Sequence, residues 1–240
     1  MSEKGRLYGI GVGPGDPDLL TLKAVRIIRE APVIFVPKGD TGEKSRALSI
    51  ISPFLRDGHE LREITLPMTR EPGALRRAWE EAAGEVIAVL DKGKDAVFVT
   101  LGDSTLYSTY YYLYEALRSR RPDLAVETVP GVSSFSAGAA VLNRALAVGR
   151  ESLAIVPASR GMDFIRRVLA AFDCVVLLKV APVLGEVINL LEELGRLEEA
   201  AYVCRCGMPG QFLKENLAGP GELPGDYFSL ILVRGKRLLP

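Results

Sequence analysis

The stretch LYGIGVGPGDP, Leu7–Pro17, decides the fold class of this chain. It begins with a short apolar run, Leu7–Val12, and turns through closely spaced glycines. Thr21 follows and can cap a segment whose apolar residues recur at helical spacing. A strand, a tight turn and a helix in this order are the unit from which α/β sheets are built. The glycines suit either a plain strand-to-helix turn or a loop whose main chain a ligand approaches.

Similar units repeat along the chain. Most of the runs are short and continuously apolar, which is typical of strands buried on both faces of a largely parallel sheet. We expect strands at Leu7–Val12, Val33–Val36, Leu61–Leu66, Ala96–Leu101, Ala125–Val129, Leu153–Pro157, Cys174–Val180, Ala201–Cys204 and Phe228–Val233. We expect helices after Thr21 and at Ala74–Leu90, Ser133–Leu146 and Val183–Leu194.

The polar, proline-containing stretch Ser119–Asp123 divides these strands about evenly. It predicts two α/β domains, residues 1–120 and 121–240, although a single sheet remains open. The 240 residues are 48% hydrophobic and 25% charged, which indicates a folded protein with a sizeable core.

Charge and composition exclude several classes of function. Thirty basic residues balance thirty acidic ones, so a generic nucleic-acid binder is disfavoured. The longest apolar stretch, Cys174–Leu184, is interrupted by Lys179 and Pro182 and is too short to span a membrane. Three cysteines do not make a disulfide framework and point to a reducing compartment, so we expect a cytoplasmic protein.

Two further motifs lie where ligands bind in open α/β sheets, outside the carboxyl ends of strands. In Thr100–Tyr107, Gly102 offers backbone access and Asp103 a carboxylate, although Asp103 or Ser104 could instead cap a helix. In Val129–Ala137, two serines could cap the next helix or bind a ligand carboxylate at its start.

A group of tyrosines follows the Gly102-Asp103 pair. Tyr107, Tyr110, Tyr111 and Tyr114 are spaced to share one helical face. A stripe at this spacing is usually core, but several phenolic hydroxyls need several partners. The stripe therefore also suits a dimer interface or the wall of a pocket for a large flat ligand.

The familiar catalytic clusters are missing from the sequence. The single histidine, His59, lies in a polar run typical of a surface turn, which excludes multi-histidine metal sites. The pair in Cys204-Arg205-Cys206 has no second pair and is better interpreted as two ordinary thiols. The chain is therefore suited to binding and orienting ligands, without a dedicated nucleophile or metal.

Taken together, these motifs resemble the tetrapyrrole methylase family of S-adenosylmethionine-dependent enzymes. The resemblance rests on Gly11–Pro17 with Leu20–Ala24, on Gly102-Asp103 and on Pro130–Ser134. Within the family it is closest to the enzymes that methylate C(20) of precorrin-2 or cobalt-factor II. That closer match is carried by Pro67–Arg70, Trp79, Gly102–Tyr110, Ser133–Ala137, Leu178–Val180 and Asp226–Leu230.

The resemblance implies a homodimer of two-domain subunits, with S-adenosylmethionine folded in the cleft between the domains. By position, the cofactor contacts would be Pro14, Leu101, Gly102, Asp103, Leu106, Ser133, Ser134, Val180 and Gly207. The acceptor carries eight carboxylates, and the cations on motif-bearing loops are Lys38, Arg70, Lys179 and Arg205. The candidates for assisting loss of the C(20) proton are Tyr107, Tyr110 and Asp103.

The implied reaction is attack of C(20) on the sulfonium methyl group. Because a sulfonium is already activated, the protein would mainly supply proximity and orientation. Three alternatives stay open: a methylase of the same pathway acting at another ring position, a nicotinamide- or flavin-dependent oxidoreductase, and a catalytically silent tetrapyrrole carrier. Pro14 argues against the oxidoreductase, because it stands where the dinucleotide fingerprint has its third glycine.

Overall fold

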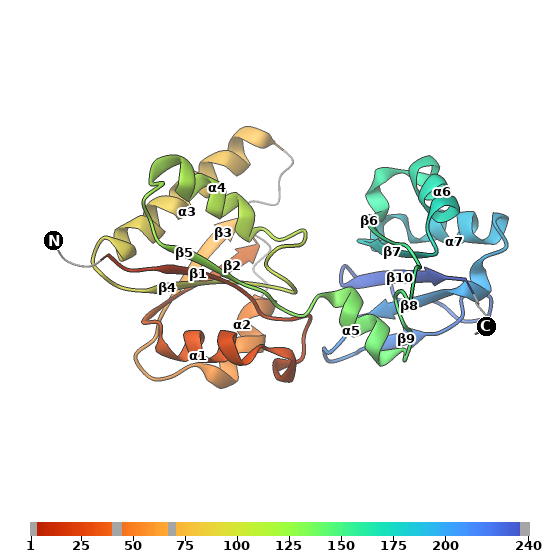
Figure 1. The fold of residues 1–240 in the computed structure, drawn as a ribbon, viewed down its shortest axis with the longest axis horizontal. Helices are drawn as coiled ribbons and strands as arrows, with labels where there is room; N and C mark the ends of the chain where they lie inside the picture. Colours follow the sequence, from red (N-terminus) through yellow and green to blue (C-terminus); the bar gives the residue numbers. More distant parts are fainter. Residues whose placement is uncertain (1–3, 40–44, 67–70, 236–240) are drawn as a thin grey trace. The chain divides into compact units, whose positions relative to one another are not determined.

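The computed structural model describes residues 4–39, 45–66 and 71–235, and it divides into two compact units (Figure 1). Unit 1 is Met1–Ser133 and unit 2 is Ser134–Pro240. Each unit contains a five-stranded sheet with its own hydrophobic core. The two α/β units confirm the predicted fold class.

The sheet of unit 1 is parallel throughout, in the order β3-β2-β4-β1-β5. Its strands follow the short apolar runs of the sequence. All five carboxyl ends therefore lie along one edge, with the end of β1 between those of β4 and β5. The strands are β1 (Leu7–Gly11), β2 (Val33–Gly39), β3 (Glu60–Leu66), β4 (Ala96–Thr100) and β5 (Val126–Val129).

Helices cover both faces of this sheet (Figure 1). The central strand β4 is buried at every residue, with Phe98 in the core under α3 and α4 and with Val97 and Val99 in the core under α1 and α2. Thr21 caps α1 as predicted, its hydroxyl accepting from the Ala24 N–H at 3.1 Å. The helical segments of unit 1 are η1 (Pro17–Leu19), α1 (Leu22–Glu30), α2 (Arg46–Ile51), η2 (Ser52–Phe54), α3 (Pro72–Leu90) and α4 (Tyr110–Arg120).

The sheet of unit 2 is mixed, in the order β6-β7-β10-β8-β9. Strands β6 and β7 are parallel, whereas β10 is antiparallel to both β7 and β8, and β9 is antiparallel to β8. Antiparallel neighbours need no crossover helix, and the chain reaches β10 from β8 through the short strand β9. The strands are β6 (Leu153–Pro157), β7 (Cys174–Leu178), β8 (Ala200–Cys204), β9 (Phe212–Lys214) and β10 (Ser229–Arg234).

Helices also cover both faces of the second sheet. Ile231 and Val233 of β10 lie in the core beneath α6 and α7, while Gly138 of α5 faces Leu230 and Val203 on the other side. The helical segments are α5 (Ser134–Val141), η3 (Ala158–Arg160), α6 (Met162–Ala171), η4 (Ala181–Val183), α7 (Leu184–Glu193) and η5 (Leu197–Glu199).

Each predicted strand overlaps an observed one, and β9 is the strand that the sequence analysis missed. The expected largely parallel arrangement holds for unit 1 and not for unit 2. Unit 1 extends to Ser133 instead of residue 120, because β5 pairs with β1 in the first sheet. No helix among the described residues is both long and apolar enough to cross a membrane.

Candidate active site

Three loops meet at the carboxyl edge of the sheet in unit 1, after β1, β4 and β5. Their backbones touch because the contact positions are glycines. A Cβ added to Gly131 would lie 2.4 Å from the Gly102 carbonyl oxygen, and one added to Gly11 would lie 2.7 Å from the same atom. Gly13 and Gly102 also exchange two main-chain hydrogen bonds, of 3.1 and 2.7 Å. Gly11 and Gly131 are therefore needed for the contact between the loops themselves.

Gly102 differs from these two glycines. Its φ is +72°, in the left-handed region that favours glycine, and a Cβ added to it would meet nothing within 4 Å. The main chain at Gly102 therefore presents an open face that a ligand can approach. Leu101 and Leu106 are partly exposed in the same loop, while Pro14 is buried in the loop after β1.

The carboxylate of Asp103 is engaged by its own chain. Oδ1 accepts from the Thr105 N–H at 2.8 Å and from the Thr105 hydroxyl, and Oδ2 accepts from the Gly131 N–H at 2.8 Å. Burial raises the pKa of this carboxyl, but the hydrogen bonds from Thr105 and Gly131 outweigh burial and hold the pKa below its usual value. Asp103 is thus ionised and joins the loop after β4 to the loop after β5.

Ser104 makes a second link between these two loops. Its side chain is fully buried, and its hydroxyl donates to the Val129 carbonyl at 2.8 Å. Helix α4 begins only at Tyr110, so neither Asp103 nor Ser104 caps it. The alternative interpretation of these two residues as a helix cap is therefore wrong, because the loop runs on to Thr109 before the helix begins.

The tyrosine stripe is not continuous. Tyr107 precedes α4, has a φ of +51° and is 49% exposed. Tyr110 is fully buried against Phe98, with its hydroxyl 3.0 Å from the Thr128 hydroxyl. A side chain in the core cannot touch a substrate, so the expectation of a catalytic role is not carried forward for Tyr110. Tyr107, which lies in the loop after β4 and is half-exposed, stays a candidate.

The carboxyl ends of β7 and β8 share one edge of the sheet in unit 2, with the start of β10 between them. Lys179 follows β7 with a φ of +56°, and Arg205 follows β8 with a φ of +52°. Such values are uncommon outside glycine, and strained residues gather at functional sites. Of the four non-glycine residues with positive φ among those described, three, including Tyr107, lie in the predicted ligand loops.

Three other predicted residues belong to unit 2, namely Ser134, Val180 and Gly207. Ser134 begins α5, and the Gly207 N–H donates to the Gln211 side chain at 2.8 Å. Val180 is fully buried in the core of unit 2, so only its main chain could meet a ligand. In unit 1, Ser133 stands at the end of the loop after β5.

Tyr227 at this edge was not predicted as a site residue. Its side chain is 65% exposed, and its ring makes an edge contact with Phe228 at 5.2 Å. The Phe228 N–H donates to the Asp226 carboxylate at 2.8 Å, and the Phe228 carbonyl accepts from the Arg205 N–H at 2.8 Å. The available signal was its place in Asp226–Leu230, one of the stretches that carries the family resemblance.

Two of the predicted substrate-binding cations are ion-paired. Lys38 on β2 contacts Glu63 on β3 at 2.8 Å, and Arg205 contacts Asp226 at 2.7 Å. Arg70 lies outside the described residues, and Lys179 is exposed. Pairing reduces the positive charge that Lys38 and Arg205 offer to an anionic ligand.

The cysteines and the histidine have no evident place in the chemistry. Cys204 and Cys206 are buried, and burial raises the pKa of the Cys204 thiol, which disfavours a reactive thiolate. His59 lies in a turn, where its Nδ1 accepts from the Arg56 N–H at 3.0 Å. Within the described part of the chain, no three His, Cys, Asp or Glu side chains are grouped to hold a metal ion.

Known proteins resemble this chain over nearly its whole length. The cobalt-precorrin-2 C(20)-methyltransferase of Salmonella typhimurium is 35% identical over 95% of this chain and 96% of that protein. The probable cobalt-precorrin-2 C(20)-methyltransferase of Methanocaldococcus jannaschii is 37% identical over the same shares. The precorrin-2 C(20)-methyltransferase of a Sinorhizobium species is 31% identical over 96% of each chain.

Solved structures share the fold. A cobalt precorrin-4 methyltransferase, itself a cobalamin biosynthetic enzyme, matches with a TM-score of 0.67 at 20% identity, over 95% of this chain and 94% of that one. The uroporphyrin-III C-methyltransferase of Thermus thermophilus, in complex with S-adenosylhomocysteine, matches with a TM-score of 0.63 at 24% identity, over 96% and 97%.

The sequence also matches the family of tetrapyrrole (corrin/porphyrin) methylases over residues 6–219. This match includes the glycine-rich turn after β1, the Gly102-Asp103 loop and the segment after β5, the three motifs on which the resemblance rested. With relatives of the same kind aligned from end to end, the family prediction is confirmed: the chain belongs to the tetrapyrrole (corrin/porphyrin) methylase family.

Proposed function

We propose that this chain is an S-adenosylmethionine-dependent methyltransferase that methylates C(20) of precorrin-2 or of cobalt-factor II. The ring position follows the names of the full-length relatives, which act on precorrin-2 or cobalt-precorrin-2. Cobalt-factor II as an acceptor follows the family resemblance. The observation that supports a cofactor site is the main chain at Gly102, which is left-handed and open to an approaching ligand. It lies where the loops after β1, β4 and β5 meet at glycines. Ligands of parallel α/β sheets bind at this edge.

On unit 1, the proposed cofactor contacts are Pro14, Leu101, Gly102, Asp103, Leu106 and Ser133. We propose that Leu101, Gly102 and Asp103 act through their main chain, because the Asp103 carboxylate is already hydrogen-bonded to Thr105 and Gly131. On unit 2, the proposed contacts are Ser134, the main chain of Val180, and Gly207.

When bound, S-adenosylmethionine supplies a methyl group on a positively charged sulfur, which leaves as a neutral thioether as the new carbon–carbon bond forms. The loops would bind and orient the cofactor and the acceptor, and such proximity and orientation are the larger part of what the reaction needs. Tyr107 is half-exposed in the loop that carries Gly102-Asp103, and its hydroxyl would relay the C(20) proton to water once the bond has formed.

The acceptor is rich in carboxylates, and we propose that Lys38, Arg70, Lys179 and Arg205 bind them. Arg205 is held by Asp226, which fixes the direction of its guanidinium at the expense of part of its charge. Lys179 is exposed at the same edge of unit 2. A homodimer is part of the same proposal and rests on the family resemblance. A cytoplasmic location is also proposed and rests on the three cysteines, which point to a reducing compartment. Sedimentation equilibrium measures the oligomeric state.

The test is anaerobic incubation of the purified protein with S-adenosylmethionine carrying a ¹³C methyl group and with each acceptor in turn. A mass gain of one methyl group is expected, and the ¹³C spectrum should assign it to C(20). Comparing the rates with precorrin-2 and with cobalt-factor II identifies the preferred acceptor, since relatives named for a metal-free and for a cobalt-containing acceptor both align with this chain. Methylation at another ring position would favour the alternative methylase, and tight tetrapyrrole binding without transfer would favour a carrier.

A further inference from the structure

Two neighbouring side chains in the Gly102 loop, those of Asp103 and Ser104, form hydrogen bonds with other residues of unit 1. We propose that Asp103 and Ser104 form a clamp that positions the loop after β4 for the cofactor, and that neither side chain binds the cofactor directly. This inference rests on the proposed function and names the positioning residues of that site. A carboxylate beside the cofactor loop would ordinarily be assigned to a ligand hydroxyl or ammonium group.

The carboxylate of Asp103 is occupied on both oxygens. Oδ1 serves the N–H and the hydroxyl of Thr105, which closes a turn within the loop. Oδ2 crosses to the next loop and accepts from the Gly131 N–H at 2.8 Å. A carboxylate has about four lone-pair positions, so most of its capacity is spent before any ligand arrives.

Ser104 supplies the second half of the clamp. Its hydroxyl donates to the carbonyl of Val129, the last residue of β5, at 2.8 Å. The Asp103 and Ser104 bonds thus hold the chain after β5 at Val129 and again at Gly131. Because the Ser104 side chain has no exposed area, any effect of Ser104 on a ligand must pass through the position of the loop.

The clamp holds the two residues that follow Gly102, and two main-chain hydrogen bonds with Gly13 hold Gly102 itself. A loop that is already held in its binding conformation loses less entropy when the ligand binds. Loss of the clamp should therefore weaken cofactor binding while the methyl-transfer step at saturating cofactor remains largely intact.

The test is a double-mutant cycle of Asp103→Ala, Ser104→Ala and the combination, with calorimetry for the Kd of S-adenosylmethionine and kinetics for KM and kcat. Each single variant should raise the Kd and the cofactor KM roughly tenfold, with kcat within a factor of about three of wild type. The fold-increase in Kd of the double variant should be clearly smaller than the product of the fold-increases of the two single variants, because both changes release the same loop.

A matched control removes a hydroxyl of β5 that is not part of the clamp. Thr128→Val deletes the partner of the Tyr110 hydroxyl on the same strand. It should lower the melting temperature and leave the Kd unchanged. Asp103→Asn keeps one acceptor oxygen and is expected to destabilise the fold less than Asp103→Ala. Its Kd for S-adenosylmethionine should lie between those of the wild type and Asp103→Ala.

The rate of amide hydrogen exchange at Gly131 measures, without any ligand, whether its N–H is held by the Asp103 carboxylate. Exchange should be slow in the wild type and faster in Asp103→Ala and in Ser104→Ala. If Ser104→Ala keeps the wild-type Kd while Asp103→Ala weakens binding, or if the two effects multiply fully, the clamp is overturned in favour of a direct carboxylate contact. If the wild type binds no S-adenosylmethionine, the proposed function fails, and the Gly131 exchange rates still decide whether the clamp exists.

Discussion

Gly102 combines a left-handed backbone with empty space in front of its Cα, whereas Gly11 and Gly131 are closed in by neighbouring main chain. The same residue type therefore serves two purposes within one group of loops. Gly11 and Gly131 let the main chains of neighbouring loops come into contact, whereas Gly102 is a position where a ligand can approach the main chain. Only the environment of each glycine separates the two purposes.

Gly102→Ala is expected to weaken S-adenosylmethionine binding at least tenfold, because the new methyl group would occupy the open face. The left-handed conformation should also cost about 1 kcal/mol of stability in alanine. Gly195→Ala is the matched control, since Gly195 has a φ of +65° and equally empty surroundings at the end of α7. Calorimetry and thermal melting on both variants separate strain from ligand contact. Equal Kd values for the two variants would show that Gly102 does not face the cofactor.

Tyr107 and Tyr110 should respond in opposite ways to loss of the hydroxyl. Tyr107→Phe is expected to lower kcat with little change in melting temperature, because the side chain is half-exposed before α4 begins. Tyr110→Phe is expected to keep kcat and to lose about 1 kcal/mol of stability, because it leaves the Thr128 hydroxyl without its partner. Steady-state kinetics and melting on both variants test this. A Tyr107→Phe enzyme with full turnover would end the proton-relay role.

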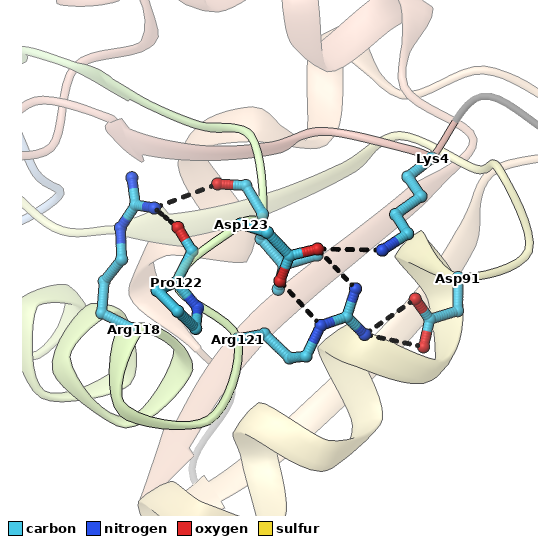
Figure 2. Close-up of polar contacts among 7 residues, drawn as sticks. Lys4, Asp91, Arg118, Arg121, Pro122 and Asp123 are labelled. Atoms are coloured by element: carbon cyan, nitrogen blue, oxygen red, sulfur yellow. Dashed lines mark hydrogen bonds and ion pairs between the residues drawn. The ribbon is translucent and has the colours of Figure 1, made fainter.

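At the scale of elements, an ion-pair network joins the ends of α3 and α4 to the start of β5 (Figure 2). Arg121 contacts Asp91 at 3.0 Å and Asp123 at 2.9 Å, and Lys4 reaches Asp123 at 2.9 Å. Arg118 donates to the Pro122 carbonyl at 2.7 Å. Ser119–Asp123, interpreted from its polarity as a domain boundary, is therefore the end of α4 and the turn after it, inside unit 1.

This network makes the stability of unit 1 sensitive to acid. Hydrogen bonds from Arg121 and then from Lys4 hold the pKa of Asp123 far below its ordinary value of 3.8. A carboxyl whose pKa is lowered by folding stabilises the protein above its unfolded-state pKa, and this stabilisation is lost as the pH falls from there toward the folded-state pKa. Asp123→Asn should therefore lose less melting temperature between pH 7 and pH 3 than the wild type loses.

The pairs are exposed, so the effect should be small and should shrink in 1 M NaCl. Melting curves at pH 7, 5 and 3, with and without salt, provide the measurement. Parallel pH curves for the wild type and Asp123→Asn would mean that this network does not contribute to acid sensitivity. Glu222→Gln in unit 2, which removes one exposed carboxylate elsewhere, controls for the general effect of charge.

At the scale of the whole molecule, the proposed reaction requires neither a thiolate nor a metal ion, because the sulfonium methyl group is activated before it binds. Cys204→Ala and treatment with EDTA should therefore leave methyl transfer to metal-free precorrin-2 running at close to the wild-type rate. Burial also raises the pKa of the Cys174 and Cys204 thiols. Loss of activity in EDTA that added zinc restores would show that Cys204-Arg205-Cys206 has been misinterpreted.

The sequence alone was sufficient for the features that depend on local pattern. Continuous apolar runs predicted β1, β4 and β7 because a strand buried on both faces needs no polar alternation. Thr21 predicted its own cap because the capping hydroxyl lies within three residues of its partner. The ordered glycine motifs identified the family, since their glycines stand at turns that favour glycine or at main-chain contacts that leave no room for a Cβ.

The tertiary structure decided what depends on residues far apart in the chain. Whether β5 belongs to the first or the second sheet depends on its pairing with β1, which no local signal encodes. Tyr107 leaves the tyrosine stripe because the loop after β4 continues to Thr109, held by Asp103 on Gly131 and Ser104 on Val129. Periodicity predicts an element where its residues contact near neighbours. The purpose of a glycine, a carboxylate or a tyrosine at the site is set by partners that the chain brings close only when it folds.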